Sequence, residues 1–461
     1  MLFPALIDGL YGSQNYRVFI LSSLITCLTG FILILSVWGK EQQLGLREAF
    51  LLTTLTWVLI AIFSSIPIYI SDSGLSFTDS FFESMSGITT TGATVIQNLE
   101  IQSKGILIWR ALLQWLGGIG IIVMAVAVLP MLQVGGMQLF RLESSDNAEK
   151  ILPRATQLAG SLVLLYVIIT MSCALAYNIG GMGLFDSLAH SLTTISTGGY
   201  STHTDSFAYF SNSNLEYIAV LFMIVGSLPF VLYLQFARGK ASSLFLDSQV
   251  LAFFTILLVS VILCVLYIQN NADISSADSI RKSLFNVTSI LTGTGYVSAD
   301  YMEWGPFIVS LFFILMLIGG CAGSTSCGLK VFRVQILYKQ VIIQTKKIAF
   351  PDAVLVPLYN GKEIPENVSK AVTSFFLLFI LSFVIIGLVL SLLGLDLITA
   401  FSASASAISN VGPGLGAIVG PTETYASIDS ISKWILSFAM LLGRLEILTV
   451  MVIFTSYFWR Q

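Results

Sequence analysis

The sequence predicts an all-α polytopic membrane protein, in which four pseudo-symmetric repeats of helix, pore half-helix and helix surround one central pore, preceded by an N-terminal helix. Three observations predict this fold: an apolar composition, long apolar stretches, and a short motif that occurs four times. Of the 461 residues, 56% are hydrophobic and 10% are charged, with a mean hydropathy of +0.88. Soluble domains average about a quarter charged residues, so an ordinary soluble fold is excluded.

Apolar stretches of membrane-spanning length recur along the whole chain. They cover residues 18–37, 50–70, 106–133, 155–177, 215–236, 249–269, 305–338, 370–393 and 431–458. Roughly 20 helical residues cross the hydrocarbon core of a bilayer. Backbone groups in lipid must be hydrogen-bonded within the segment, so each stretch is predicted to be a helix.

The Lys and Arg residues are distributed unevenly over the two ends of these helices. If each stretch crosses once, one side holds Arg17, Lys104, Arg110, Arg281, Lys282 and Lys433, and Arg444 falls inside a stretch. The other 15 of the 22 basic residues lie on the opposite side. The positive-inside rule identifies that crowded side as cytoplasmic.

Four short segments repeat along the chain, at residues 81–93, 188–199, 285–296 and 401–413. Aligning them places Gly92, Gly198, Gly295 and Gly412 in register, 106, 97 and 117 residues apart. Each segment lies between two apolar stretches and is too short and polar to cross a bilayer. Irregular backbone at membrane depth is tolerated only where it is buried in protein or lines a water-filled cavity. We therefore predict four re-entrant half-helices, each followed by a loop at one axis.

This periodicity divides the chain into five regions. They are an N-terminal helical region (1–45), pore repeat 1 (46–140), pore repeat 2 (141–240), pore repeat 3 with a broken inner helix (241–345), and a cytoplasmic loop with pore repeat 4 (346–461).

The composition of the four loops suits a dehydrated monovalent cation. A ring of backbone carbonyls can replace the water around an ion, and Gly permits the backbone conformations that turn carbonyls toward an axis. Each preceding half-helix directs its negative C-terminal end toward the ion. The loops contain no carboxylate, whereas a calcium-selective pore favours an acidic ring. The alternative is a set of packing turns between buried helices, where Gly and Thr are common.

At these residues the chain resembles the TrkH/KtrB family of bacterial potassium-uptake subunits, closest to the TrkH type. The resemblance extends from about residue 17 to residue 461. It includes three further stretches, LQWLGGIG at 113–120, IGGCAGST at 318–325 and LGRLE at 442–446. In that family Gly at all four aligned positions marks potassium-preferring members, whereas Ser at the first accompanies sodium permeation in plant relatives.

The resemblance implies a set of ion-contacting backbone carbonyls. They belong to Thr90 and Thr91, Ser196 and Thr197, Gly293 and Thr294, and Asn410 and Val411. Two features depart from the family pattern. TrkH-type members usually have a complete helix ahead of residue 18, so we expect either a truncated start or a short helix in residues 1–11. The loop that is Gly-rich in the family carries Ser326-Cys327 after Ser-Thr here.

The stretch 305–338 is interrupted at 319–328 by residues too dense in Gly and Ser for continuous helix. We predict an intramembrane loop beneath the four central loops, with a close-packed kink as the alternative. The resemblance implies a gating loop that obstructs the cytoplasmic half of the pore. Its candidate residues are Gly319, Gly320, Gly323, Ser324, Thr325 and Gly328.

Arg444 lies at the middle of the apolar stretch 431–458. A charge at mid-membrane costs about 2.5–3.5 kcal/mol on insertion scales, which makes it a functional candidate. A structural ion pair with a distant acid is the alternative. The resemblance implies that Arg444 projects into the pore as an electrostatic barrier and acts together with the gating loop.

The partners follow mainly from the resemblance. It implies a cytosolic nucleotide-binding regulatory ring protein of the TrkA type, a homodimer of pore subunits, and a multi-pass location in the bacterial inner membrane. The basic segment 330–369 is the longest predicted cytoplasmic loop; such loops are also ordinary topology signals or contacts to lipid head groups.

No pattern in the chain predicts a cofactor. The segment GPGLG at 412–416 has the wrong spacing for a dinucleotide loop and follows a predicted half-helix rather than a strand. The two His residues are too separated for a metal cluster. We expect no cofactor bound by this chain, no enzyme activity and no nucleic-acid partner, with potassium as the transported substrate.

Two other functions remain open at this point. A secondary symporter would couple potassium or sodium to a second ion and would carry intramembrane acids, for which Glu83, Asp396 and Glu446 are the candidates. A membrane enzyme or receptor scaffold would not need four repeated loops.

Overall fold

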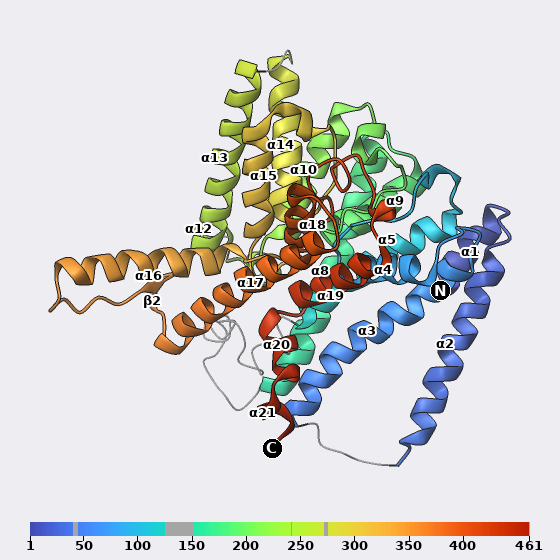
Figure 1. Cartoon of the computed structure of the whole chain (residues 1–461), viewed down its shortest axis with the longest axis horizontal. Coiled ribbons are helices and arrows are strands. Elements are labelled where there is room, and N and C mark those ends of the chain that lie inside the picture. The colour runs from blue at the N-terminus through green and yellow to red at the C-terminus, as the bar shows by residue number, and fades with distance from the viewer. Residues whose placement is uncertain (40–44, 125–150, 241, 272–274, 461) are drawn as a thin grey trace.

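The computed structural model describes residues 1–39, 45–124, 151–240, 242–271 and 275–460, with the side chains of residues 46 and 151–156 excepted. Within that part of the chain six helices are long and apolar enough to cross a membrane, and two bent helix pairs raise the number to as many as eight. The predicted all-α membrane fold is confirmed (Figure 1).

The helices of spanning length are α2 (Tyr16–Ser36), α3 (Leu46–Ile70), α5 (Lys104–Val123), α8 (Ile151–Ile179), α13 (Ser248–Asn271) and α17 (Glu366–Leu392). The predicted end of the stretch 106–133, from residue 125 onward, lies outside the described residues. The remaining inner helices are α10 (Ser213–Ser227) with α11 (Phe230–Ala237), α15 (Pro306–Ile318) with α16 (Val331–Ala349), and α19 (Ser430–Arg444) with α20 (Ile447–Met451).

Two of these inner stretches were each predicted as one helix, and that prediction is wrong. Helices α10 and α11 meet at an angle of 93°, and α19 meets the segment that begins with α20 at 114°. Pro229 accounts for the first bend, because its ring has no N–H to continue the helix ladder and disfavours helical backbone in the residue before it. Glu446 marks the second, with a φ of +65°. The predicted break within 305–338 is confirmed as the gap between α15 and α16.

Four short buried helices occupy the predicted half-helix positions: α4 (Phe77–Ile88), α9 (Leu184–Ile195), α14 (Ser276–Thr292) and α18 (Leu397–Ser409). Capping fixes the start of three of them, since Ser76, Ser275 and Asp396 accept hydrogen bonds from the backbone N–H groups of Asp79, Asp278 and Thr399. Their side chains include many small Ser, Thr and Ala residues at buried positions, which allows close packing against the surrounding helices.

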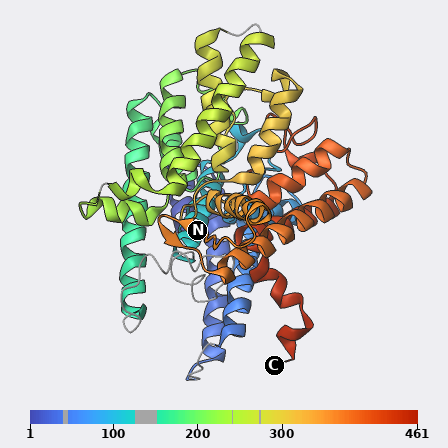
Figure 2. The ribbon, with the colours of Figure 1, turned by 90° about the vertical axis from the view of Figure 1, so that its left-hand side faces the viewer.

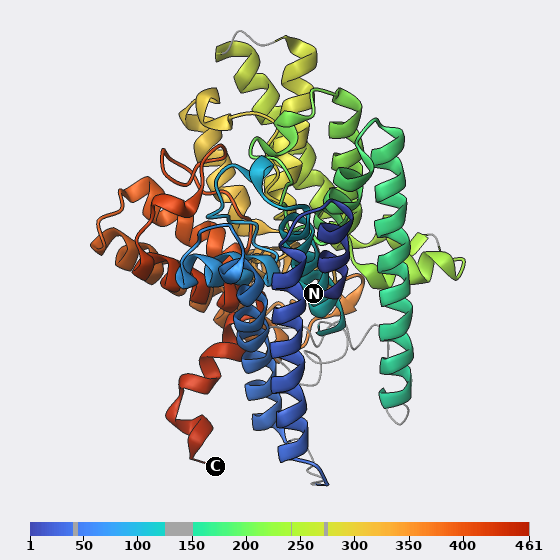
Figure 3. The same ribbon diagram turned by 90° about the vertical axis from the view of Figure 1, so that its right-hand side faces the viewer.

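Helix contacts close the four repeats into a ring. Each half-helix contacts the helix before it and the helix after it within its own repeat: α3, α4 and α5; α8, α9 and α10; α13, α14 and α15; and α17, α18 and α19. Between repeats, α5 contacts α9, α10 contacts α14, α15 contacts α18, and α19 returns to α4. Figure 2 and Figure 3 show α13, α14 and α15 as one group at the top of the molecule, with α8 along an edge.

The N-terminus forms the short helix α1 (Leu2–Leu10), which packs against α2 and α5. Asp8 joins it to the start of α5, accepting hydrogen bonds from the backbone N–H of Gly105 at 2.6 Å and from the Ser103 hydroxyl at 3.1 Å. A carboxylate at a helix N-terminus is favourable because the free N–H groups and the helix dipole both attract it.

Several small elements complete the described chain. They are α12 (Ser242–Leu246), α21 (Ser456–Trp459), the antiparallel strands β1 (Leu358–Tyr359) and β2 (Lys362–Glu363), and the 3-10 helices η1 (Leu99–Ile101), η4 (Ser206–Tyr209), η5 (Tyr301–Trp304), η6 (Tyr425–Ser427) and η7 (Val452–Phe454). Helix α16 projects away from the bundle toward these strands, across the direction of α13 (Figure 1).

Candidate functional site

Each half-helix ends in the same backbone conformation. Positive φ angles occur in pairs two residues apart: Thr90 and Gly92, Thr197 and Gly199, Gly293 and Gly295, and Asn410 and Gly412. For a non-Gly residue this left-handed region is uncommon, and its recurrence at four half-helix ends marks one shared turn. We call these turns the four central loops.

The hydrogen bonds of these turns give the same register. The N–H groups of Thr91, Gly198, Thr294 and Val411 donate to the carbonyls five residues earlier, of Ser86, Thr193, Ser289 and Ser406. The structural equivalents of Thr90 and Thr91 in the second repeat are therefore Thr197 and Gly198. The predicted register, with Ser196, Thr197 and Gly198, is wrong by one residue there, and Gly199 is the equivalent of Gly92, Gly295 and Gly412.

The two adjacent glycines of the second loop serve different purposes. A Cβ on Gly199 would collide with the Thr294 carbonyl of the next loop, and its φ is +77°. Gly198 has no such φ, but a Cβ there would collide with the side chain of Gln114 from α5. Sequence alignment missed Gly199 because both positions are Gly and nothing local separates them.

The four central loops approach one another in cyclic order. A Cβ on Gly92 would meet the Gly198 carbonyl, one on Gly199 the Thr294 carbonyl, one on Gly295 the Val411 carbonyl, and one on Gly412 the Thr91 carbonyl. The absence of side chains at these four glycines is what allows neighbouring backbones to come so close.

The carbonyl oxygens of these loops are buried and mostly unpaired. The eight residues Thr90, Thr91, Thr197, Gly198, Gly293, Thr294, Asn410 and Val411 are all buried. Among the described residues, only the Gly198 carbonyl of this set accepts a hydrogen bond, from Gln114 Nε2 at 2.6 Å. Buried carbonyls are normally satisfied, so a group of unpaired ones facing the neighbouring loops indicates a place for a cation or ordered water.

Two tyrosines fasten the loops to the neighbouring half-helix. The hydroxyl of Tyr200 donates to the Glu83 carbonyl at 2.8 Å, and that of Tyr296 donates to the His190 carbonyl at 3.1 Å. Glu83 and His190 occupy equivalent positions, seven residues before Thr90 and Thr197. The first three repeats are thus joined by the same contact.

A buried ion pair supports the first loop from behind. Arg110 Nε lies 2.7 Å from Glu83 Oε1, and both side chains are fully buried. Glu83 also accepts the backbone N–H of Val95, and the guanidinium lies 4.0 Å from the centroid of the Tyr200 ring. Glu83 therefore stabilises the segment that follows the first loop.

The intramembrane loop 319–328 is hydrogen-bonded to two of the half-helices. Ser326 Oγ lies 2.6 Å from the Thr292 carbonyl at the end of α14. Thr325 Oγ1 lies 3.1 Å from the Ile195 carbonyl at the end of α9 and 3.2 Å from Thr197 Oγ1. Of the six residues predicted to act in gating, Gly319, Gly323 and Gly328 have positive φ.

Arg444 makes contact with this loop. Its Nη1 donates to the Thr325 carbonyl at 3.1 Å and to Cys327 Sγ at 2.7 Å, and its Nη2 donates to the Gly117 carbonyl at 2.8 Å. The side chain is 1% exposed. No acidic partner of Arg444 is present among the described residues, so the ion-pair alternative from the sequence finds no support there.

A second charged cluster joins the far end of the intramembrane loop to α20. Glu446 pairs with Arg333 and lies 3.5 Å from Lys330, and all three are buried. Lys330 and Glu446 both have positive φ, at +61° and +65°. Two strained backbone positions are therefore held by one set of ion pairs.

Glu100 links the segments that follow the first and second loops. It accepts hydrogen bonds from the backbone N–H of Thr204 at 2.8 Å and from the Thr204 hydroxyl at 2.7 Å. Partial burial alone would raise the pKa of Glu100, but these hydrogen bonds outweigh it and lower the pKa below its usual value.

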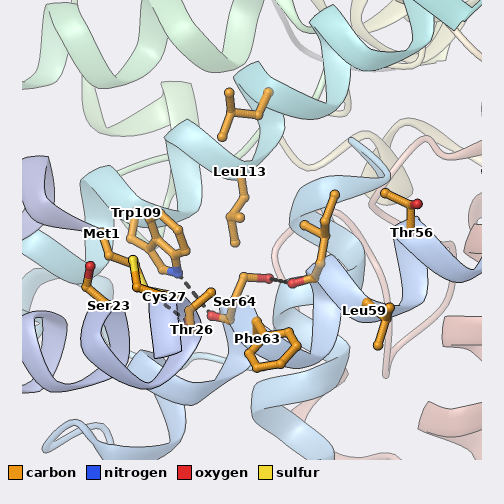
Figure 4. A pocket seen from close by; sticks show the side chains of 12 residues that line it. Met1, Ser23, Thr26, Cys27, Thr56, Leu59, Phe63, Ser64, Trp109 and Leu113 are labelled. Atoms are coloured by element: carbon orange, nitrogen blue, oxygen red, sulfur yellow. Dashed lines mark hydrogen bonds between the residues drawn. The ribbon is translucent and has the colours of Figure 1, made fainter. Parts of the chain in front are cut away.

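A cavity of about 440 Å³ lies apart from the central loops, between α1, α2, α3 and α5 (Figure 4). Its lining contains no acidic side chain, and Trp109 Nε1 at its wall donates to the Ser64 carbonyl at 3.0 Å. Its lining is mainly apolar, which distinguishes this cavity from the central loops.

Comparison with known proteins agrees with this architecture. Residues 16–460 match the family model TrkH, described as a cation transport protein. The chain is 41% identical over its whole length to the Trk system potassium uptake protein TrkI of Halomonas elongata, covering 94% of that protein. It is 36% identical to the Trk system potassium uptake protein TrkH of Escherichia coli K12, covering 96% of it.

A solved structure is similar over the same extent. The crystal structure of the potassium transporter TrkH from Vibrio parahaemolyticus matches with a TM-score of 0.92 at 35% identity, covering 100% of this chain and 96% of that one. The chain belongs to the TrkH family of cation transport proteins.

Proposed function

We propose that this protein takes up potassium across the bacterial inner membrane through a channel-like pore, with the four central loops as its selectivity filter. The observation that carries the proposal is the group of buried carbonyls that lack protein hydrogen bonds. They belong to Thr90, Thr91, Thr197, Gly293, Thr294, Asn410 and Val411, with Gly198 as the eighth filter carbonyl. Carbonyl oxygens can replace the water around a potassium ion.

The intramembrane loop and Arg444 form the gate in this proposal. The loop is fastened under the filter by Ser326 and Thr325, and Arg444 holds it from the fourth repeat. In this closed arrangement the guanidinium also repels a cation that has passed the filter. A TrkA-type cytosolic regulatory ring, acting on a homodimer of pore subunits, would release the loop; the basic helix α16 directly follows it.

The five regions of the sequence, 1–45, 46–140, 141–240, 241–345 and 346–461, are proposed as the anchoring region and the four repeats. A secondary symporter is the alternative function. Its candidate acids are already engaged: Glu83 pairs with Arg110, Glu446 pairs with Arg333, and Asp396 caps α18. A coupled ion would have to displace these partners from the acids, so the contacts favour the pore.

The test is ion flux into proteoliposomes that contain the purified chain, wild type and Ser326→Ala, at stepped membrane potential. We expect potassium and rubidium flux that follows the voltage and exceeds sodium flux. Flux that requires an imposed proton or sodium gradient would establish the symporter instead. The absence of any preference for potassium in both forms would refute the filter.

A further inference from the structure

Gln114 on α5 connects the two ends of the second filter turn. Its Nε2 donates to the Gly198 carbonyl at 2.6 Å, and its Oε1 accepts the backbone N–H of Tyr200 at 3.0 Å. The side chain is completely buried. One amide group therefore bridges the residues on either side of Gly199 and fixes the direction of the Gly198 carbonyl.

The other repeats have a different residue at this position. Glycines of three inner helices lie against half-helix carbonyls in the same way: Gly117 against Ile88, Gly226 against Ile195, and Gly443 against Ile408. Three residues before them stand Gln114, Met223 and Met440, all buried. In the third repeat Met316 stands three residues before Gly319, where α15 ends. A thioether cannot donate a hydrogen bond, so within the part of the chain that the structure describes only the first repeat supplies an amide to a neighbouring filter carbonyl.

The consequence is an unequal ring of carbonyls. At the level of Thr91, Gly198, Thr294 and Val411, one oxygen is hydrogen-bonded to an amide, whereas among the described residues the other three accept no hydrogen bond. The hydrogen bond from the Gln114 amide fixes the orientation of the Gly198 carbonyl, one of the four oxygens of this ring. The amide also competes with a bound ion for electron density on that oxygen. A collapse of this carbonyl toward a smaller ion would stretch the 2.6 Å hydrogen bond.

We infer that Gln114 is a positioning residue that raises the preference for potassium over sodium by restraining the Gly198 carbonyl. This inference rests on the proposed filter function and assigns one determinant of its selectivity. Gln114 touches no ion; it acts through the oxygen that does. The contact also requires Gly at position 198, because a Cβ on that residue would displace the Gln114 amide.

The test compares Gln114→Met, which places in the first repeat the residue type of the other three, with the matched control Gln335→Met. Gln335 likewise donates from Nε2 to a carbonyl, that of Ser248 at 2.7 Å, but on α16 away from the filter. We expect the potassium-to-sodium permeability ratio of Gln114→Met to fall about fivefold, the factor of one net hydrogen bond. The ratio of the control should equal that of wild type.

Gln114→Glu adds a readout that a purely structural role would not give. The introduced carboxyl group donates to the Gly198 carbonyl only while protonated, so the ratio should be near wild type at low pH and fall as pH rises. Wild type should show no such profile. A wild-type ratio in Gln114→Met with ample current, or a ratio in Gln114→Glu that rises with pH, overturns the inference. Loss of potassium preference already in wild type refutes the filter itself, which separates the two failures.

Discussion

The hydroxyl oxygen of Ser326 lies 2.6 Å from the carbonyl oxygen of Thr292, and this bond joins the intramembrane loop to the last turn of the half-helix α14. The same hydroxyl accepts the backbone N–H of Gly320 at 2.8 Å, which closes the loop on itself. The proposed gate and the proposed filter thus share a hydrogen-bonded contact, with no intervening element.

Ser326→Ala removes both bonds of this hydroxyl. A net hydrogen bond is worth about 1 kcal/mol, so the closed loop should lose enough stability to raise rubidium flux about fivefold or more in the absence of a regulatory partner. The control is Ser172→Ala. In wild type the Ser172 hydroxyl donates to the Ile168 carbonyl on the exposed side of α8. Unchanged flux in Ser326→Ala would mean that this contact does not hold the gate.

Substitutions of Arg444 separate its charge from its hydrogen bonds. Lys keeps the positive charge but lacks the planar fork that reaches the Thr325 carbonyl, Cys327 and the Gly117 carbonyl together. We expect Arg444→Lys and Arg444→Ala both to raise flux at fixed voltage, with Ala having the larger effect. Wild-type flux in Arg444→Lys would show that the charge alone closes the pore.

Gly199→Ala tests the register of the second loop. The new methyl group would meet the Thr294 carbonyl in a left-handed backbone, a conformation that alone costs about 1–2 kcal/mol. The potassium-to-sodium permeability ratio should fall at least about tenfold. Gly160→Ala, on an exposed face of α8 with open space around it, should leave the ratio unchanged. A normal ratio in Gly199→Ala would contradict its equivalence with Gly92.

Glu446→Gln leaves the buried charges of Lys330 and Arg333 without their carboxylate. Removing one partner of a buried ion pair costs about 3–5 kcal/mol, so the midpoint of thermal unfolding in detergent should fall markedly. Glu366→Gln is the matched control, because its pair with Lys370, at 2.8 Å, is exposed and contributes little. Equal midpoints for the two variants would show that the cluster does not stabilise the fold.

Much of the fold could be predicted from the sequence because its signals are local. The half-helices follow from short polar segments between apolar stretches, as α4 and α9 show. The break at 319–328 follows from its Gly and Ser content, and Arg444 is conspicuous as a charge in an apolar stretch. Each of these features depends on the solvation or backbone freedom of a few adjacent residues.

The remaining features depend on residues far apart in the chain. Two adjacent glycines are locally equivalent, and only the Thr294 carbonyl on one side and Gln114 on the other assign separate purposes to Gly199 and Gly198. Glu446, at the second bend, likewise pairs with Arg333, more than a hundred residues away. The sequence by itself thus determined four re-entrant segments and the lack of acids in the loops that end them. The tertiary structure decided the register of the carbonyls, because close approach between neighbouring repeats is a property of the assembled ring.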